Sequence, residues 1–430
     1  MSPSRPDDRR GPRSLQVAVV GAGAAGLLAA IFAARRGARV ALFETKKRPG
    51  AKIRVSGGGR CNILPSRVEP DGDFHTSGSP TSLRNLLLSW PLAEVRAFFQ
   101  DELGIPLKVE PGGKVFPASE RPQDVVAALL GECERRGVTL ICGARIVEVR
   151  RLEDAATPVF ELRSLGGDVW RAERLVLATG GLSLPKSGSD GGGLEIARSL
   201  GLEVAPTYPV LVALESADPR WLELPGVSTR ATLRAVQEGR ILEEREGDFL
   251  FTHRGFSGPV VLDLSRHVTM PTPGGEGPGF RVRWGGNAAP RWLAFLRGGG
   301  RKQVAVELRR FLPRRLAAFL VALEGLEPEI RLCDLRKDDV RSLARRLEEC
   351  PLPVARSEGF RTAEATGGGI PLSELRLKSL ESRSVPGLHL SGEMLDVDGR
   401  IGGYNCLWAW VTGRRAGLGA GEGAAGPSGG

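Results

Sequence analysis

Three glycines near the start of the chain have the spacing of a phosphate-binding turn. Gly21, Gly23 and Gly26 lie in the stretch VVGAGAAG, between an apolar run and the first residues of a helical pattern. In such a turn the first glycine allows a tight bend, the second lets the backbone approach a pyrophosphate, and the third lets the helix pack on the strand. The backbone N–H groups at the start of the helix, at Ala24 and Ala25, would then face the phosphates.

An acidic residue completes this motif at the end of the next predicted strand. Glu44 closes the apolar run ARVALFE and is followed by Thr45. A carboxylate at this place can accept hydrogen bonds from both hydroxyls of an adenosine ribose, and it repels a 2′-phosphate. The whole arrangement predicts a bound dinucleotide, and a tight turn without a ligand is the alternative.

Two later glycine clusters also follow predicted strands. One is Thr179, Gly180 and Gly181 in LVLATGG, and the other, in LHLSGEMLDVDGRIGGYN, contains Gly392, Glu393, Asp396, Gly402, Gly403, Tyr404 and Asn405. Each cluster alone could be an ordinary turn. Together they favour FAD over NAD, because a long flavin dinucleotide needs close backbone approaches from several segments of the chain. Tyr404 could shield the flavin or pack in the core.

A further glycine-rich stretch places loose backbone beside reactive side chains. Its residues are Ser56, Gly57, Gly58, Gly59, Arg60, Cys61 and Asn62. Because glycine costs backbone entropy in regular structure, the stretch is either a surface loop or a place where something approaches the backbone closely. Arg60 or Lys52 could neutralise a pyrophosphate or a reduced flavin, and Asn62 could bond the cofactor or cap a turn. For Cys61 we favour small buried packing over a redox role, because the chain has no CxxC pair.

The composition argues against several other functions. Six scattered cysteines and four histidines show no metal-ligand spacing, so we expect no metal site and a reducing, cytoplasmic location. No apolar run is long enough for a membrane span, and the first residues do not form a secretory signal. The net charge is +10, and the run from Arg281 to Lys302 holds six basic residues and no acidic one. Such a run could bind nucleic acid, but we favour a solvated basic face because no RNA-binding motif accompanies it.

The secondary structure that is expected to position these residues differs between regions of the chain. Residues 15–44 have the pattern strand, glycine turn, helix, strand, which predicts an α/β fold with a Rossmann-like parallel sheet and helices. We expect this domain at 14–201 and 360–418, with an insertion between that has a β subdomain at 202–300 and a helical subdomain at 301–359. Residues 1–13 and 419–430 are expected to be disordered tails.

The chain resembles the BaiN-like (YhiN-like) FAD-dependent oxidoreductases, of the two-dinucleotide-binding-domain class. The resemblance covers about 14 to 418 and rests on VVGAGAAG, KIRVSGGGRCN, ATGG, GDFLFTHRGFSGP, TGGG at 366–369, SLESRSVPGLHLSGEMLDVDG and GGYN, in this order. It implies an FAD domain interrupted by an insertion with a β and a helical subdomain. It also implies that a carboxylate before the last glycine pair holds the ribityl chain, for which we favour Asp396 over Asp398, and that the loop at 57–59 crosses the cofactor.

These observations lead to one main hypothesis and two alternatives. The main hypothesis is an FAD-dependent oxidoreductase that moves hydride from NAD(P)H to a small unsaturated organic substrate. The alternatives are a flavin-dependent RNA-modifying enzyme that uses the basic insertion, and a non-enzymatic flavin-binding regulator. The catalytic residues are not identified by the sequence. His253 and Tyr404 are the candidates, although for His253 we favour a bond to a backbone turn in the inserted domain.

Overall fold

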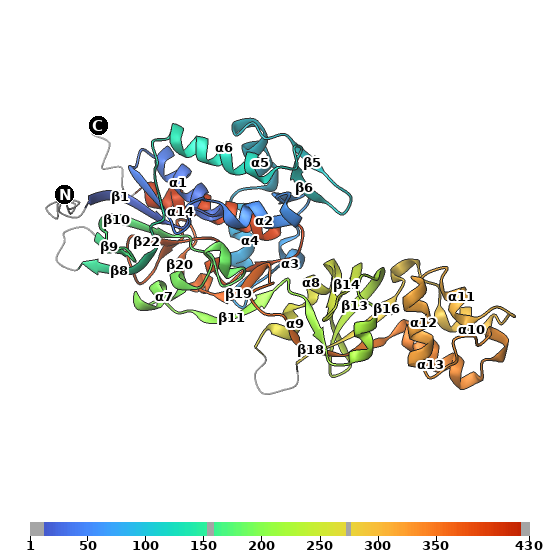
Figure 1. Cartoon of the computed structure of the whole chain (residues 1–430). Coiled ribbons are helices and arrows are strands. Elements are labelled where there is room, and N and C mark those ends of the chain that lie inside the picture. The colour runs from blue at the N-terminus through green and yellow to red at the C-terminus, as the bar shows by residue number, and fades with distance from the viewer. Residues whose placement is uncertain (1–12, 153–158, 272–276, 423–430) are drawn as a thin grey trace, which may run out of the picture. The chain divides into compact units, whose positions relative to one another are not determined.

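The computed structural model describes residues 13–152, 159–271 and 277–422, and the chain forms two compact units (Figure 1). The first unit combines both ends of the chain, Met1–Thr207 and Ala365–Gly430. The second is the segment between them, Tyr208–Glu364, which we call the inserted unit. The tails predicted at 1–13 and 419–430 lie outside the described residues, except for Arg13 and 419–422.

A largely parallel sheet forms the centre of the first unit. Its strands lie in the order β20-β21-β22-β10-β1-β2-β7, and β9 and β8 continue antiparallel from β10. The neighbours from β22 to β7 are all parallel, as the α/β prediction requires. The strands are β1 (Arg13–Val20), β2 (Val40–Glu44), β7 (Thr139–Cys142), β8 (Ile146–Leu152), β9 (Val159–Ser164), β10 (Val169–Leu177), β20 (Leu375–Arg376), β21 (Glu381–Ser382) and β22 (Leu388–Leu390).

The first helix and the last helix of this unit pack closely on each other. A Cβ atom at Gly413 would lie 2.3 Å from the carbonyl oxygen of Ala25, and one at Gly417 would lie 2.3 Å from that of Ala29. Only glycine permits this approach of the two helices. The helices of the unit are α1 (Ala24–Arg35), α2 (Ala51–Gly59), α3 (Pro70–Asp73), α4 (Pro80–Leu88), α5 (Leu92–Ala97), α6 (Pro122–Arg135), α7 (Gly192–Ser199) and α14 (Tyr404–Glu422).

Three small sheets complete the first unit. They pair β3 with β6 and β5, β4 with β23, and β11 with β19. The hairpin of β5 and β6 turns at a Gly-Gly pair, Gly112 and Gly113. The strands are β3 (Leu64–Pro65), β4 (Phe74–His75), β5 (Leu107–Val109), β6 (Lys114–Pro117), β11 (Ala205–Val210), β19 (Ala365–Gly369) and β23 (Asp398–Gly399).

The inserted unit has its own sheet and its own hydrophobic core. The strand order is β17-β16-β13-β14-β15-β12-β18, and every pair is antiparallel. The strands are β12 (Leu214–Ser216), β13 (Ser228–Gln237), β14 (Arg240–Phe251), β15 (Gly255–Ser257), β16 (Gly279–Trp284), β17 (Cys350–Leu352) and β18 (Val354–Ser357). The helices are α8 (Pro259–Leu264), α9 (Arg266–Thr269), α10 (Trp292–Arg297), α11 (Val304–Leu308), α12 (Arg314–Leu323) and α13 (Lys337–Glu348).

The helical subdomain and the C-terminal tail have other boundaries in the structure than those predicted. The helical region begins at Trp292 and ends at Glu348, and the residues after it return to the sheet as β17 and β18, because Cys350 and Leu352 alternate as buried strand residues against β16. The predicted C-terminal tail is wrong for 419–422, since α14 continues to Glu422 and Ala420 is fully buried. Among the described residues no helix has the length and apolar composition to cross a membrane.

Candidate dinucleotide site

The carboxyl ends of four parallel strands meet at one edge of the sheet. Val20 of β1 lies beside Phe43 of β2 and Leu177 of β10, and Leu177 in turn lies beside Leu390 of β22. The residues that follow these strands are therefore neighbours. They include the predicted glycine turn, Glu44, the cluster at 179–181 and the cluster that begins at Gly392. This edge is where open α/β sheets bind their ligands.

Within the glycine turn, the protein itself requires two of the three glycines. A Cβ atom at Gly21, whose φ is +103°, would lie 2.4 Å from the carbonyl oxygen of Ala178, and one at Gly26 would lie 1.7 Å from that of Gly21. At Gly23 a Cβ atom would meet nothing within 4 Å, and its φ of −85° suits any residue. The space beside Gly23 is therefore open, which is compatible with the predicted approach of a pyrophosphate.

The N-terminus of α1 has backbone N–H groups that no side chain caps, and such groups can bind an anion. Its N-cap, Gly23, gives no side-chain acceptor and its first turn has no acidic residue, so the N–H groups there are left for a ligand. Gly392 reaches the same turn, because a Cβ atom on it would lie 2.8 Å from that of Ala25. Its position is fixed by hydrogen bonds with the Thr412 hydroxyl at 2.9 Å and the Trp408 indole at 3.1 Å.

The Glu44 carboxylate lies at the end of β2 and is 9% exposed. One oxygen accepts the N–H of Ala22 at 3.0 Å and the other that of Lys46 at 2.8 Å. Burial raises the pKa of this carboxyl, and the two hydrogen bonds oppose the rise. Each oxygen keeps a further lone pair, so the carboxylate can still accept both hydroxyls of a ribose. Thr45, the next residue, is half-buried.

The stretch of three glycines follows a short helical segment. The backbone leaves the helix at Ser56, and Gly57, Gly58 and Gly59 all have positive φ, at 58°, 69° and 80°. These left-handed conformations by themselves favour glycine. Gly57 is also packed against Asn62, whereas Gly58 and Gly59 open into free space. The loop thus presents exposed backbone, which fits the predicted close approach of a ligand.

Lys52, Ser183 and Glu393 form a cluster that the sequence did not reveal. The Lys52 ammonium donates to the Ser183 hydroxyl at 2.8 Å and to the Glu393 carboxylate at 2.5 Å, and Ser183 also donates to Glu393. The lysine and glutamate side chains are 26% and 20% exposed. The charge of Lys52 is therefore already balanced within the protein, and its role toward a pyrophosphate stays a prediction. One of its three donors still has no partner among the described residues.

The three residues after the glycines are held by the protein. The Arg60 guanidinium pairs with Glu110 at 2.8 Å and lies over the Phe116 ring at 4.2 Å, so it is committed to the β5–β6 hairpin. Cys61 is fully buried, and burial raises the pKa of its thiol far above the ordinary value, which fits packing and not redox chemistry. The Asn62 amide, oriented to satisfy its neighbours, accepts the Gly403 N–H at 3.1 Å.

The two later clusters use their glycines mainly to pack the protein. A Cβ atom at Gly180 would lie 2.5 Å from the Ser189 hydroxyl, and one at Gly181 would lie 2.5 Å from that of Thr366. At Gly403 it would lie 2.6 Å from the backbone of Leu64.

Neighbouring residues of these clusters also contact the protein. A Cβ atom at Gly402 would lie 3.4 Å from the ring of Tyr404, and Thr179 donates to the sulfur of Met394 at 3.2 Å. Asn405 exchanges two hydrogen bonds with the backbone of Gly399. The predicted approach of the flavin to Gly402 and Gly403 is therefore not what requires these glycines.

Three of the predicted site residues have the following surroundings, and their roles toward a ligand stay predictions. Asp396 is 2% exposed and accepts the N–H of Ser77 at 3.1 Å, so Glu393 is the more accessible carboxylate of this segment for a ribityl hydroxyl. Tyr404 is buried with its ring at the edge of Phe74, 5.7 Å between centroids, which is core packing. His253 is exposed in the turn between β14 and β15 of the inserted unit.

The residues that sequence reasoning missed are small hydroxyl side chains. Thr366 accepts the N–H groups of Leu182 and Ser183 at 2.9 and 3.0 Å and so fixes the loop after β10. Thr412 fixes Gly392 in the same way. Thr366 stands in the TGGG motif and was within reach of motif reasoning. Nothing in the sequence marks Ser183 or Thr412.

The fold and the site together define a dinucleotide-binding protein of the Rossmann type. The chain belongs to the HI0933-like family, because residues 15–419 match the family described as "HI0933-like protein Rossmann domain". This confirms the resemblance to BaiN-like flavoproteins. The protein is a flavin-dependent oxidoreductase with FAD as its cofactor, and the open space at Gly23, the α1 N-terminus and Glu44 fit that cofactor.

Relatives with names cover nearly the whole chain. The "Ribosomal RNA dihydrouridine synthase" of Escherichia coli is 34% identical over 92% of this chain and 95% of its own length. The "3-dehydro-bile acid delta(4,6)-reductase" of Clostridium scindens is 32% identical over 95% and 99%. Among solved structures, the 3-ketosteroid-delta4-(5alpha)-dehydrogenase of Rhodococcus jostii RHA1 shares the fold, with a TM-score of 0.50, 17% identity and coverage of 96% and 98%.

Proposed function

We propose that the protein reduces a carbon–carbon double bond conjugated to a carbonyl group, with NAD(P)H as the electron donor. The observation that carries the proposal is the dinucleotide site at the carboxyl edge of the sheet, where Gly23 and Glu44 fit one FAD. Bound FAD supplies a carrier that accepts a hydride from the donor and delivers it to the substrate. The sequence has one GxGxxG turn placed between a predicted strand and a predicted helix, so donor and substrate would use the flavin in alternation.

The relatives support this reaction class from two directions. A 3-dehydro-bile acid delta(4,6)-reductase acts, by its name, on ring double bonds of a keto steroid, and a dihydrouridine synthase makes the saturated form of uridine. Uracil and such a steroid share a ring double bond conjugated to a carbonyl group. The small unsaturated substrate expected from the sequence belongs to the same chemical class.

The residues of the edge have separate tasks in this proposal. The N–H groups at the start of α1 hold the pyrophosphate, and Glu44 holds the adenosine ribose. Glu393 accepts a hydrogen bond from a hydroxyl of the ribityl chain. Ser183 and Lys52 keep the Glu393 carboxylate in its orientation. The free donor of Lys52 is then available to a polar atom of the cofactor or substrate.

A second candidate has RNA as the substrate, with reduction of a uracil base. The observation that favours it is the basic segment of the inserted unit. Between Arg281 and Arg315 the chain holds ten basic residues and a single acidic one, Glu307. The E. coli and Haemophilus influenzae relatives with 34% and 31% identity carry the name of an enzyme that acts on ribosomal RNA.

The test is anaerobic mixing of the FAD-loaded protein with NADH and with NADPH, followed by the acceptors. The acceptors are a cyclic enone, a steroid 4-en-3-one and a uridine-containing RNA. We expect one of the two donors to bleach the flavin absorbance, and an acceptor to restore it. Reduction by dithionite alone would contradict the proposal and point to the non-enzymatic regulator. Reoxidation by RNA but by neither enone would select the second candidate.

A further inference from the structure

The basic segment of the inserted unit has many charges that the protein does not neutralise. Arg283 and Lys302 have acidic partners, Glu348 and Glu307. Six other arginines of the segment are exposed and form no ion pair with any described residue: Arg281, Arg291, Arg297, Arg301, Arg309 and Arg314. Like charges at this density repel one another and create a positive field that attracts a polyanion.

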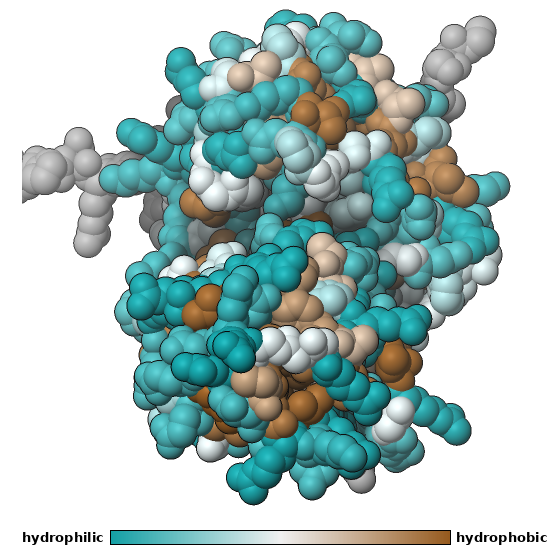
Figure 2. All heavy atoms as spheres, turned by 90° about the vertical axis from the view of Figure 1, so that its right-hand side faces the viewer, coloured by the Kyte–Doolittle hydropathy of each residue, from teal (hydrophilic) through white to brown (hydrophobic). Residues whose placement is uncertain are grey.

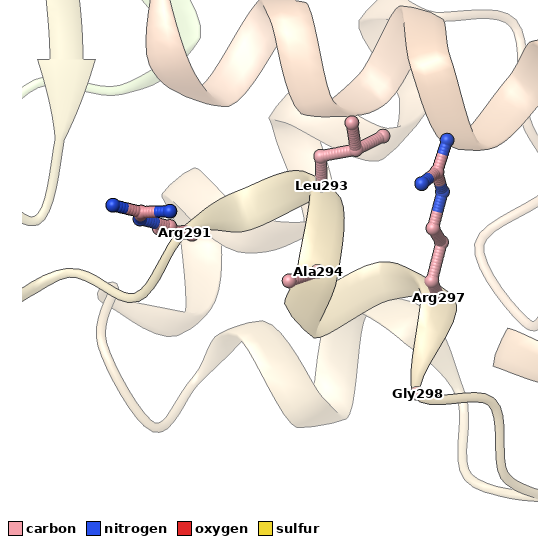
Figure 3. Close-up of a pocket in the computed structure, with 5 residues that line it drawn as sticks. All are labelled: Arg291, Leu293, Ala294, Arg297 and Gly298. Carbon is pink, nitrogen blue, oxygen red and sulfur yellow. The ribbon is translucent and has the colours of Figure 1, made fainter.

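Two of these arginines lie at a hollow on the surface of α10. The hollow has a volume of about 510 Å³ and is lined by Arg291, Leu293, Ala294, Arg297 and Gly298. Figure 3 shows the two arginines leaving opposite ends of the helix, with Leu293 and Ala294 between them. Arg297 follows Arg291 by six positions, about 9 Å along the helix axis, so each guanidinium can meet a different phosphate of one strand.

The hollow is not purely cationic. Leu293 is 39% exposed between the arginines. The face of the molecule in Figure 2 is mostly hydrophilic, and hydrophobic residues form small patches on it. An apolar wall between two guanidinium groups suits the alternation of base and phosphate in a nucleic acid. A lipid headgroup or an acidic peptide needs the charges but has no flat ring to place against Leu293.

The helix that carries the arginines is firmly supported. Trp292 and Leu296 of α10 are almost fully buried. The rings of Trp292 and Phe295 both contact Phe311, with centroids 5.6 and 5.5 Å apart. Because the backbone of α10 is fixed in this way, the guanidinium groups lose less freedom when they bind a ligand.

We infer that the α10 hollow, with Arg291 and Arg297 at its ends and Leu293 between them, docks a single-stranded or looped segment of RNA. The inference rests on the second candidate of the proposed function and names its binding surface. Unpaired RNA is the form expected, since only there are bases free to turn toward a protein surface. Arginine suits the task because its planar guanidinium can bond a phosphate with two N–H groups.

The test measures RNA binding by fluorescence anisotropy, with a labelled oligouridine strand and a labelled RNA hairpin. The variants are Arg291→Gln, Arg297→Gln and both together. The matched control is Arg240→Gln, which removes one exposed charge. Arg240 lies at the Gln237 end of the β13–β14 hairpin, whereas Trp284, which leads to α10, pairs with β13 near its other end.

We expect the double variant to bind oligouridine roughly tenfold more weakly, and the slope of log affinity against log salt to fall by about 0.7 for each lost phosphate contact. Arg240→Gln should bind as the unchanged protein does. Equal losses of RNA affinity in Arg240→Gln and Arg297→Gln would overturn the inference. They would show that RNA responds to the overall charge of the protein and not to a particular site. Unchanged binding in the double variant would also overturn it, as would binding of phosphatidylglycerol vesicles but not of RNA.

Reduction of the flavin by NAD(P)H in the absence of RNA separates this inference from the proposed function. All three α10 variants should keep their FAD content and their rate of reduction. Failure of the reduction in every protein, including the unchanged one, counts against the proposed function alone. Loss of RNA binding with normal reduction supports the docking surface alone.

Discussion

At the scale of single residues, the glycine turn contains two glycines that the packing of the protein requires and one that it does not. Gly21 and Gly26 are enclosed by the backbone of the protein, and Gly23 faces free space. The GxGxxG pattern does not show this difference, which depends on the distance to β10 and on the turn itself. The difference can be tested by mutation.

Gly23→Val should abolish tight FAD binding and leave the fold intact. The side chain meets no protein atom and its backbone angles are allowed, but it fills the position for the pyrophosphate. A misfit of about 1–3 kcal/mol corresponds to a roughly tenfold to hundredfold rise in the Kd of FAD. Gly26→Val is the comparison, and it should fail to fold because its Cβ atom would lie 1.7 Å from the oxygen of Gly21. Titration of the apoprotein with FAD and circular dichroism distinguish the two results, and normal FAD affinity in Gly23→Val would contradict our placement of the cofactor.

The buried histidine His389 should make the free energy of unfolding depend on pH. His389 of β22 is buried and shares a hydrogen bond of 2.9 Å with the Ser379 carbonyl. Burial lowers the pKa of His389 to about 4 from 6.5, although Ser379 and Glu381 oppose this shift. Between these two pH values the unfolded chain binds a proton that the folded protein does not, so the free energy of unfolding falls as the pH falls.

We expect this loss to reach at most about 1.4 kcal/mol per pH unit and to end below about pH 4. The measurement is urea unfolding of the apoprotein at a series of pH values, for the unchanged chain and for His389→Asn. The variant keeps a donor near Ser379 but has no titratable ring. The difference between the two curves should therefore shrink from pH 7 toward pH 4. Parallel curves would contradict the assignment.

Residue roles were harder to predict than residue positions. The sequence correctly indicated which segments reach the carboxyl edge, since each follows a buried strand. It could not show that Asp396 is taken by Ser77 while Glu393 stays accessible. Asp396 and Ser77 are far apart in the sequence, so a local sequence pattern cannot show that they form a hydrogen bond.

At the scale of elements, the contact of α1 with α14 depends on small residues. Gly417 lies against the backbone of Ala29, whereas Gly131 of α6 has no atom within 4 Å of the position of a Cβ. The same substitution should therefore have opposite effects at the two places. Glycine inside a helix costs roughly 0.5–1 kcal/mol relative to alanine.

Gly131→Ala should raise the free energy of unfolding by about 0.5–1 kcal/mol, because the unfolded chain loses freedom and no atom must move. Gly417→Ala should lower it by about 1–3 kcal/mol, since the new methyl group would lie 2.3 Å from the Ala29 oxygen and push the helices apart. Urea unfolding of both variants checks the signs. Stabilisation by Gly417→Ala would show that α14 does not pack on α1 at this distance.

The same contact explains why the end of α14 was predicted wrongly. Its last residues, GLGAGE, are small and resemble a tail that has nothing to bury. In the structure the lack of side chains is what lets the helix continue against its neighbour, up to Glu422. The βαβ unit at 15–44 was predicted correctly, because its strand, turn and helix signals are all local.

At the scale of the whole molecule, the chain has two hydrophobic cores that share no residue. One contains the central sheet with α1 and α14, and the other contains the sheet and helices of the inserted unit. All residues assigned here to FAD belong to the first unit, 1–207 and 365–430. A ligand stabilises the structure that binds it and leaves an independent unit unchanged.

Calorimetry of the full chain should therefore show two unfolding transitions, of which FAD moves one. With free FAD at about one hundred times its Kd, the transition of the first unit gains about 2.7 kcal/mol. A marker variant assigns the other transition. Leu343→Ala removes a fully buried side chain from α13 and should cost the inserted unit about 2–5 kcal/mol while leaving the FAD shift unchanged. A single transition that responds to both FAD and Leu343→Ala would mean that the two cores unfold as one cooperative structure.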